Sequence, residues 1–447
     1  MQYLIKNVSI VNEGKISHGD VLIKDQIIEK IAPHIQVKGA VKEIDAEGKT
    51  LIPGVIDEHV HFREPGLTDK AEIKTESRAA VAGGVTSFME MPNTIPPVLT
   101  EEILENKYIR ASQSSLANYS FYMGVSHDNL EEVYKMNKRK QEVCGVKIFI
   151  GSTTGNMLVD DEKTLSKIFG KSELLIATHC ENEAIVQANL AKFIEEKGEA
   201  GLELSDHPLI RNVEGCYTSS KSTIALAQKF DTRLHIVHIT TGREVNLFTN
   251  QIPLEEKRIT SEVCVHHLWF TSDDYEEYGN KIKCNPAIKA PKNKSDLWGG
   301  LLDDRLDCIA TDNAPHTAAE KTQPFYKAPA GIPLVQHGLL MMLNKYKDGV
   351  ISLEKIVEKM CHNPAICYQV EKRGYIREGY YADLVLLDLN QDFEVNKKNI
   401  YFKCGWSPLE GHIFPAKVEK TFVNGNMVYD NGKFNDESRG MRLKFDR

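Results

Sequence analysis

Two histidines separated by one residue form the most chemically suggestive stretch of this sequence. His59 and His61 follow a short apolar run, 51–57, which is bounded by turn-forming residues and therefore predicts a buried strand. Because side chains alternate along an extended chain, both imidazoles leave the strand end on the same side. Neutral imidazole is the commonest ligand for zinc, so the pair could form half of a metal site. Arg63 has the same parity and would place a planar, permanently charged guanidinium, suited to a carboxylate, beside that metal.

An isolated His-x-His pair is more often an ordinary polar exit from a strand, so the surrounding elements must decide. The middle of the chain alternates strand-like and helix-like stretches, which predicts βα units. Helix-like stretches include 70–82, 99–112 and 218–230. With the run before His59 there are about eight strand candidates, the number that closes a (β/α)8 barrel. The strand candidates are 51–57, 85–91, 120–125, 146–150, 174–179, 234–239, 259–264 and 308–312.

Both ends of the chain predict short β segments. Those near the start are 3–11, 19–25 and 27–31, and those near the end are 382–388 and 418–429. Asn424-Gly425 lies between two alternating runs and is a strong hairpin signal. Neither piece has enough apolar residues for its own core, so we expect them to pair into one small flanking β-sandwich. The predicted organisation is an α/β barrel domain at 51–375, with the sandwich formed by 1–50 and 376–447.

Composition limits the classes of function. The chain has 447 residues, of which 41% are hydrophobic and 26% charged, values typical of a folded globular protein. The net charge of −8 and the lack of a basic stripe with interleaved aromatic residues argue against nucleic acid as a partner. No secretory signal or membrane-spanning run is apparent. The 9 cysteines are scattered without a Cys-x-x-Cys pair, which favours reduced thiols and a cytoplasmic location.

The barrel prediction can be tested on the sequence itself, because barrel enzymes build their active sites at the C-terminal ends of the strands. The polar residues that could bind a metal ion or take part in catalysis fall at those positions. They are His59 and His61 on the first strand, Asn93 after the second, Lys147 in the fourth, His179 on the fifth, His238 on the sixth and Asp312 on the eighth.

This layout closely resembles that of the amidohydrolase superfamily. Within the superfamily, the motifs at 59–66, 91–94 and 312–316 are similar to those of the dihydroorotase family. The resemblance extends over nearly the whole chain, including the flanking β segments. It implies a small-molecule substrate and the reversible, zinc-dependent interconversion of dihydroorotate and N-carbamoyl-aspartate in pyrimidine biosynthesis. Homodimers are usual among similar enzymes, so we expect a homodimer.

The resemblance also implies a centre of two zinc ions. One ion would be held by His59, His61 and Asp312, and the other by His179 and His238. Lys147 would bridge both as an N-carboxylated side chain, together with a hydroxide. A physical argument supports this role, since an ammonium group near two dications is disfavoured by like charge and by desolvation, whereas its carbamate is an anionic ligand. The alternative is that Lys147 reaches the surface or pairs with a carboxylate.

The implied mechanism uses Asp312 as general base and then as general acid for the leaving amide nitrogen. The substrate contacts that the resemblance implies are His61, Arg63, Asn93 and His316 around the metal and carboxylate, and Asn285 with the backbone of Ala330 and Gly331 at the ring edge. An alternative for Arg63 is a salt bridge with Glu64 or Asp69. His266 and His267 follow the seventh strand but match no ligand position, so we interpret them as structural.

Two other functions stay open at this point. One is a dihydropyrimidinase, hydantoinase or allantoinase, which shares the metal layout. Arg63 argues against it, because by the same resemblance those relatives lack an arginine there. The other is a catalytically inactive dihydroorotase-like subunit. Such chains usually lose metal ligands, whereas every ligand position is occupied here.

Overall fold

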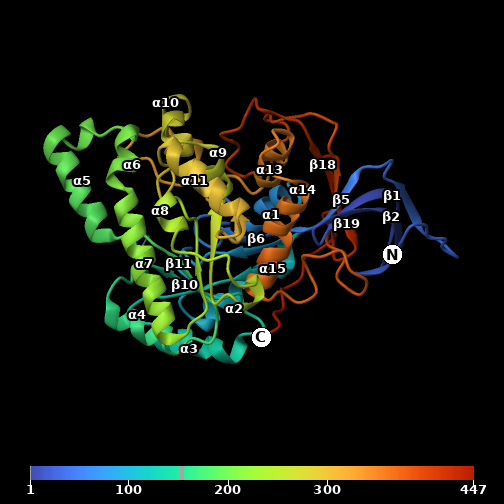
Figure 1. The fold of residues 1–447 in the computed structure, drawn as a ribbon, viewed down its shortest axis with the longest axis horizontal. Coiled ribbons are helices and arrows are strands. Elements are labelled where there is room, and N and C mark those ends of the chain that lie inside the picture. Colours follow the sequence, from blue (N-terminus) through green and yellow to red (C-terminus); the bar gives the residue numbers. More distant parts are fainter. Residues whose placement is uncertain (1, 152–155) are drawn as a thin grey trace.

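The computed structural model describes residues 2–151 and 156–447 (Figure 1). Its central strands are all parallel and form two hydrogen-bonded sections, β6-β7-β8 and β9-β10-β11-β12-β13-β14. The strands are β6 (Val55–Val60), β7 (Val85–Glu90), β8 (Asn118–Phe121), β9 (Met123–Gly124), β10 (Val146–Phe149), β11 (Ile176–His179), β12 (Leu234–Ile236), β13 (Ile259–Cys264) and β14 (Cys308–Ala310).

The two sections adjoin at both ends. Only Tyr122 separates β8 from β9, so these two strands share one position in the order. At the other side, an isolated parallel bridge joins Val60 to Asn313, and the His61 amide donates to the Asn313 carbonyl at 2.7 Å. This contact brings the end of β6 beside the segment that follows β14. The result is the eight-position strand order that a (β/α)8 barrel requires.

Helices surround these strands, as Figure 1 shows. The longest are α1 (Ile73–Ala82), α2 (Glu101–Ser114), α5 (Glu183–Lys197), α7 (Val213–Phe230), α11 (Pro291–Leu302) and α13 (Gly338–Lys347). The shorter ones are α3 (Leu130–Lys135), α4 (Glu162–Phe169), α6 (His207–Ile210), α8 (Gly242–Val245), α9 (Val265–Trp269), α10 (Tyr275–Tyr278), α12 (Ala318–Lys321), α14 (Leu353–Val357) and α15 (Asn363–Tyr368).

Local chemistry explains where helix α7 begins. The Asn212 side chain accepts a hydrogen bond from the Gly215 amide and caps α7, which therefore starts several residues before the predicted stretch 218–230.

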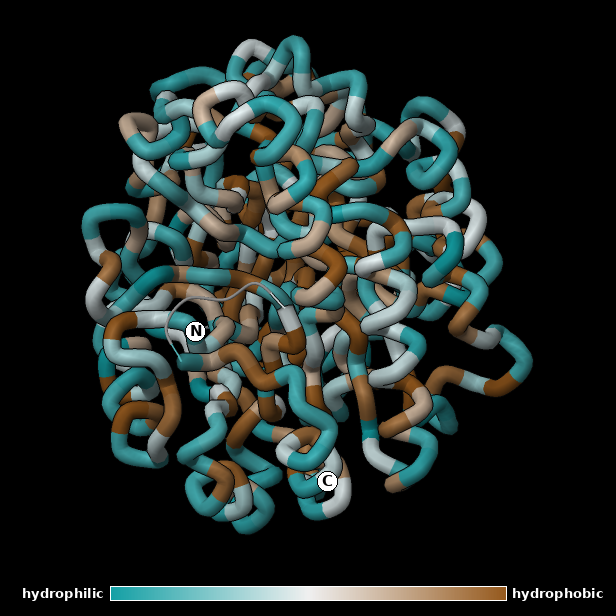
Figure 2. The backbone as a smooth tube through the Cα atoms, turned by 90° about the vertical axis from the view of Figure 1, so that its left-hand side faces the viewer, coloured by the Kyte–Doolittle hydropathy of each residue, from teal (hydrophilic) through white to brown (hydrophobic). Residues whose placement is uncertain are grey.

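Figure 2 shows hydrophobic segments concentrated inside the molecule and hydrophilic segments in the outer turns. Among the described residues, no helix combines the length and apolar character needed to span a bilayer.

The two ends of the chain share one sheet beside the barrel, seen at the right of Figure 1. Its order is β20-β19-β18-β15-β5-β1-β2-β3, with β4 beside β1. The bounds are β1 (Gln2–Asn12), β2 (Lys15–Lys24), β3 (Ile27–Ala32), β4 (Lys42–Asp45), β5 (Thr50–Pro53), β15 (Leu384–Asp388), β18 (Lys417–Val423), β19 (Asn426–Asp430) and β20 (Lys433–Phe434). A separate pair, β16 (Phe393–Glu394) and β17 (Ile413–Phe414), completes the strands described.

The predicted pairing of the two termini is therefore present, because β5 lies between β1 and β15. The two-layer sandwich and the domain boundaries at 50/51 and 375/376 stay predictions. The single strand predicted at 51–57 is divided at Gly54 into β5, in the flanking sheet, and β6, in the barrel. A side chain at Gly54 would overlap that of Thr86, so the close approach of the chain at this transition requires glycine.

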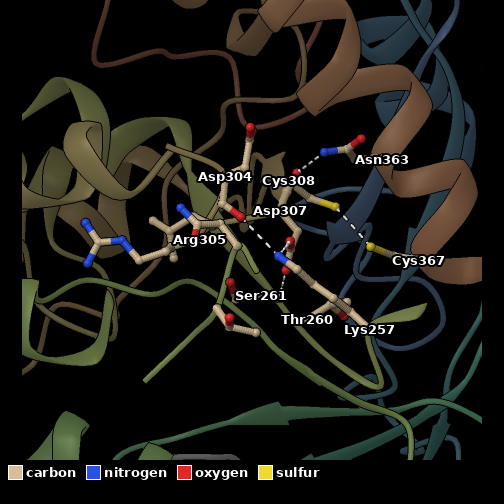
Figure 3. A network of polar contacts seen from close by, with 12 residues as sticks. Lys257, Thr260, Ser261, Asp304, Arg305, Asp307, Cys308, Asn363 and Cys367 are labelled. Carbon is tan, nitrogen blue, oxygen red and sulfur yellow. Dashed lines mark hydrogen bonds and ion pairs between the residues drawn. The ribbon is translucent and has the colours of Figure 1, made fainter. Parts of the chain in front are cut away.

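A buried polar network ties the barrel together near the start of β14 (Figure 3). Lys257 Nζ donates to Asp307 Oδ1 at 2.6 Å, and the other Asp307 oxygen accepts from the Ser261 amide at 2.9 Å. Asn363, in α15, donates to the Asp307 carbonyl at 2.7 Å. Lys257 and Asp307 are both buried, so the pair links the segments before β13 and β14 away from solvent.

All nine cysteines lie in the described part of the chain, and all are free thiols.

Candidate metal centre

The structure brings His59, His61 and Asp312 together at one edge of the barrel. All three side chains are buried. Asp312 Oδ1 lies 3.2 Å from His59 Nε2 and 3.1 Å from His61 Nε2. One ligand atom from each residue lies within 4.8 Å of the other two, so the three could hold a metal ion. This is one of the two ligand groups that the sequence predicts.

The second predicted group lies next to the first. His179 ends β11 and His238 follows β12. Nδ1 of His179 lies 2.8 Å from Nε2 of His238, so the two imidazoles present nitrogens to each other. The rings of His59 and His238 are 5.4 Å apart between centroids, which places the two groups side by side.

Lys147, in β10, lines the same cavity as both groups. The residue is 1% exposed, and Nζ has no hydrogen-bond partner among the described residues. Neither predicted alternative holds in the described part of the chain, because this amine is buried and pairs with no carboxylate there; it lies over the Phe149 ring, 5.1 Å from the centroid. Burial lowers its pKa to about 8, although the carboxylates of Glu262 and Asp312 act in the opposite direction. An orphaned amine beside imidazoles and a carboxylate fits a lysine that carries a metal-bridging carbamate.

Three of the four imidazoles contact a polar side chain through the ring nitrogen that faces away from the centre. Such outer partners fix the ring orientation of metal-binding histidines. His59 Nδ1 lies 2.5 Å from Glu262 Oε1, His61 Nδ1 lies 2.7 Å from Asn93 Oδ1, and His179 Nε2 lies 3.0 Å from Glu181 Oε2.

Two of these partners, Glu181 and Glu262, were not predicted from the sequence. Glu181 follows His179 by two residues, a parity that could have suggested its position. Glu262 is 203 residues from its partner His59, and no local pattern indicates that contact. Asn93 is predicted as a substrate contact, which stays a prediction; its Oδ1 lies against His61, and the residue lines the cavity.

Arg63 is a buried cation at the rim of this centre. The residue is 7% exposed and forms no ion pair among the described residues. Its Nε donates to the Pro315 carbonyl at 3.2 Å, and Nη2 lies 3.1 Å from His316 Nε2. The predicted alternative of a salt bridge is absent from the described structure, since Glu64 pairs with Arg110 instead. The guanidinium therefore has unused capacity to bind an anion.

One cavity of about 450 Å³ joins the two groups and the predicted substrate contacts. Asn285 Oδ1 has no hydrogen-bond partner in the described structure, which leaves it available to a ligand. The predicted residues that line the cavity are His59, His61, Arg63, Asn93, Lys147, His179, His238, Asn285, Asp312, His316, Ala330 and Gly331.

Three residues that line this cavity have strained backbone. Arg63, His238 and Asp312 have φ angles of 68°, 44° and 45°, in the left-handed region that non-glycine residues seldom adopt. Each such conformation costs on the order of 1–3 kcal/mol and persists only where the surroundings impose it. After Asp312, Asn313 Oδ1 accepts from the amides of Leu334 and Val335 at 2.8 and 3.1 Å. Asn313 thus holds the segment that carries Asp312.

Comparison with known proteins supports the resemblance found in the sequence. The amidohydrolase family model matches residues 50–428. A dihydroorotase of Lactobacillus acidophilus is 30% identical over 437 residues, which cover 97% of this chain and 100% of the relative. An allantoinase of Solibacter usitatus is 30% identical over 451 residues, which cover 99% and 96%. The solved structure of an L-hydantoinase from Arthrobacter aurescens superposes with a TM-score of 0.91 at 27% identity, covering 97% of both chains.

Proposed function

This chain belongs to the amidohydrolase family, and we propose that it is a dihydroorotase. Such an enzyme hydrolyses the ring amide of dihydroorotate to N-carbamoyl-aspartate and catalyses the reverse cyclisation in pyrimidine biosynthesis. The observation that carries this proposal is Arg63, a buried guanidinium without a carboxylate partner in the described structure. An unpaired buried cation is costly, and the carboxylate of dihydroorotate would compensate it.

In this proposal the centre holds two zinc ions. His59, His61 and Asp312 would hold one ion, and His179 and His238 the other. Lys147, as an N-carboxylated side chain, and a hydroxide would bridge them. When bound, a zinc pair supplies hydroxide at neutral pH and polarises the amide carbonyl. The orphaned amine of Lys147 supports this assignment, because a carbamate would give that buried group the partners it lacks.

Asp312 is the proposed proton carrier. Burial opposes its ionisation, but the neighbouring imidazoles of His59 and His61 hold its pKa well below the ordinary value. The group is therefore a carboxylate in the resting site, ready to accept a proton. In the forward direction it would take the proton of the attacking water and deliver it to the leaving ring nitrogen.

The remaining contacts would orient the ring. Arg63 and His316 would bind the substrate carboxylate, with the amide of Asn93 beside them. Burial, together with the positive charges of Arg63 and Lys70, lowers the pKa of His316, so this imidazole is neutral and binds by hydrogen bonding. Asn285 and the backbone of Ala330 and Gly331 would contact the opposite edge of the ring, within the same cavity.

A second candidate function is hydrolysis of a neutral cyclic amide, and the allantoinase and hydantoinase among the relatives favour it. The test is to compare turnover of dihydroorotate, allantoin and hydantoin by the purified protein. We expect dihydroorotate to be preferred. Turnover of hydantoin or allantoin with none of dihydroorotate would refute the proposal. The cytoplasmic location and the homodimer stay predictions.

Metal analysis separates the enzyme from an inactive subunit. An active dinuclear enzyme should retain about two zinc ions per chain at the proposed centre after gentle purification. A chain with an empty centre and no turnover of any cyclic amide would instead be a binding or scaffolding subunit.

A further inference from the structure

Another group of ligating side chains lies next to the dinuclear centre but shares none of its proposed ligands. Cys264 ends β13, and His266 and His267 lie in the short helix α9 that follows. One ligand atom of each residue lies within 4.8 Å of the other two. The three residues are 0%, 1% and 3% exposed. We call them the Cys-His-His cluster.

The hydrogen bonding of His267 identifies its free nitrogen. Nε2 lies 3.1 Å from the Pro286 carbonyl. A carbonyl oxygen can only accept a hydrogen bond, so Nε2 carries the proton and Nδ1 carries the lone pair. Nδ1 is buried and has no hydrogen-bond partner in the described structure. A metal-binding imidazole is typically held in this way, with one nitrogen donating to a carbonyl and the other left for the ion.

His266 is even less satisfied. Neither of its ring nitrogens forms a hydrogen bond of normal geometry with the described residues, although the Thr311 backbone lies close by. An unsatisfied buried polar group costs about 1–3 kcal/mol. A purely structural histidine would be expected to satisfy its ring through hydrogen bonds. Even with the Thr311 backbone beside one nitrogen of His266, the interpretation of His266 and His267 as structural leaves the other nitrogen of that ring and Nδ1 of His267 without a partner in the described structure.

The third donor is a thiol that faces the two imidazoles. Cys264 Sγ also lies 3.7 Å from Glu262 Oε1, so a negative charge borders the cluster. A second thiol, Cys284, lies 3.9 Å from His267 Nε2, on the protonated side of that ring. Its Sγ contacts the Pro286 carbonyl at 3.3 Å. Cys284 therefore borders the cluster but is not counted among its ligands.

We propose that Cys264, His266 and His267 bind a further metal ion of the zinc class, as one thiolate and two imidazoles. Sulfur and imidazole donors select zinc and similar ions over magnesium or calcium. Zinc–sulfur bonds of about 2.3 Å and zinc–nitrogen bonds of about 2.0 Å place tetrahedral donors roughly 3.5 Å apart. The present spacing therefore requires only a modest movement of the three side chains toward the ion. This site does not depend on which cyclic amide the enzyme hydrolyses.

Cobalt distinguishes this site from the dinuclear centre, whose proposed ligands are only nitrogen and oxygen atoms. A thiolate bound to Co²⁺ gives a charge-transfer absorption in the near ultraviolet, which nitrogen and oxygen ligands do not give. The full-length protein would be produced in cobalt-supplemented medium, so that the ion is present during folding. We expect about three cobalt ions per chain together with the thiolate absorption. Two ions without that absorption would overturn the proposal.

Single substitutions then locate the site. Cys264→Ser and His266→Gln should each remove the absorption and one ion per chain, while the other two ions stay bound. Cys404→Ser tests the one partly exposed thiol, and Cys361→Ser tests a buried thiol that contacts the Pro53 carbonyl. Both control variants should keep the absorption. Its loss in either control, or its persistence in Cys264→Ser, would show that another cysteine binds the metal and would refute the assignment. If Cys264→Ser does not fold, the ion count and absorption of the unaltered protein still decide.

Discussion

Replacement of Arg63 by methionine tests the proposed substrate most directly. Methionine is also unbranched and fills much of the same space, but it has no charge and no hydrogen-bond donors. The guanidinium is buried and faces the cavity beside Asp312, so its interaction with a substrate carboxylate would be little screened by solvent. Removing one partner of a buried, hydrogen-bonded charge pair costs about 2–5 kcal/mol. At about 1.4 kcal/mol per factor of ten, kcat/KM for dihydroorotate should fall roughly 30-fold to 4,000-fold.

The assay measures kcat/KM for dihydroorotate and for a neutral ring such as hydantoin, on the original protein and on the variant. The neutral ring gains nothing from the guanidinium, so any residual activity toward it should change little. Arg63→Lys is the matched control, because it keeps the charge but loses the planar fork, and it should retain part of the dihydroorotate activity. Zinc content should be the same in all three proteins.

A second measurement separates binding from folding. Arg63 forms no ion pair in the described structure, and burial lowers its pKa, so the charge itself disfavours the folded state without substrate. Arg63→Met should therefore not lower the melting temperature. An equal loss of activity on charged and neutral substrates, or a loss of zinc, would refute the reasoning and assign Arg63 a structural role.

Four further predictions follow from the same structure. Lys147→Ala should lose metal and activity together, because it removes the proposed shared ligand from the cavity that the two groups line; retained metal or retained activity would contradict this. Asp312→Asn should lose more activity than metal, because it removes the proton carrier but keeps an oxygen ligand, and unchanged turnover would exclude that role. Burial lowers the pKa of Lys147 to about 8, and only the neutral amine reacts with CO₂. The rate at which the metal-free protein regains activity with added zinc, at constant dissolved CO₂, should therefore fall about tenfold for each pH unit below about 8. A rate that does not change with pH would show that carbamate formation is not the rate-limiting step. Lys257→Met should lower the free energy of unfolding by about 3–5 kcal/mol, because it strands the buried carboxylate of Asp307. Urea denaturation measures this loss, and the double variant with Asp307→Leu should recover most of it.

Local sequence information was sufficient to locate the barrel strands approximately, apart from the division of the first one, and the chemical groups near their ends. His59 and His61 share a side because side chains alternate along a strand, and this is true whatever the strand packs against. Lys147 could be placed in a buried strand because its neighbours Val146 and Ile148 are apolar. Even the pairing of the two termini could be predicted, because neither has enough apolar residues to form a core alone.

Individual side-chain contacts between distant segments could not be predicted from the sequence. Glu262 lies against His59, and Asn93 against His61, only because the folded barrel brings together residues that are 203 and 32 positions apart in the chain. The division of the first predicted strand at Gly54 depends on the approach of Thr86. Periodicity reports how a residue relates to its chain neighbours, whereas hydrogen-bond partners depend on where the whole chain places other segments. For that reason the sequence by itself determined which groups this protein brings to the barrel rim. Only the tertiary structure decided which side chains orient the imidazoles. It also decided that, among the described residues, Lys147 Nζ has no hydrogen-bond partner and Arg63 is buried without an ion pair.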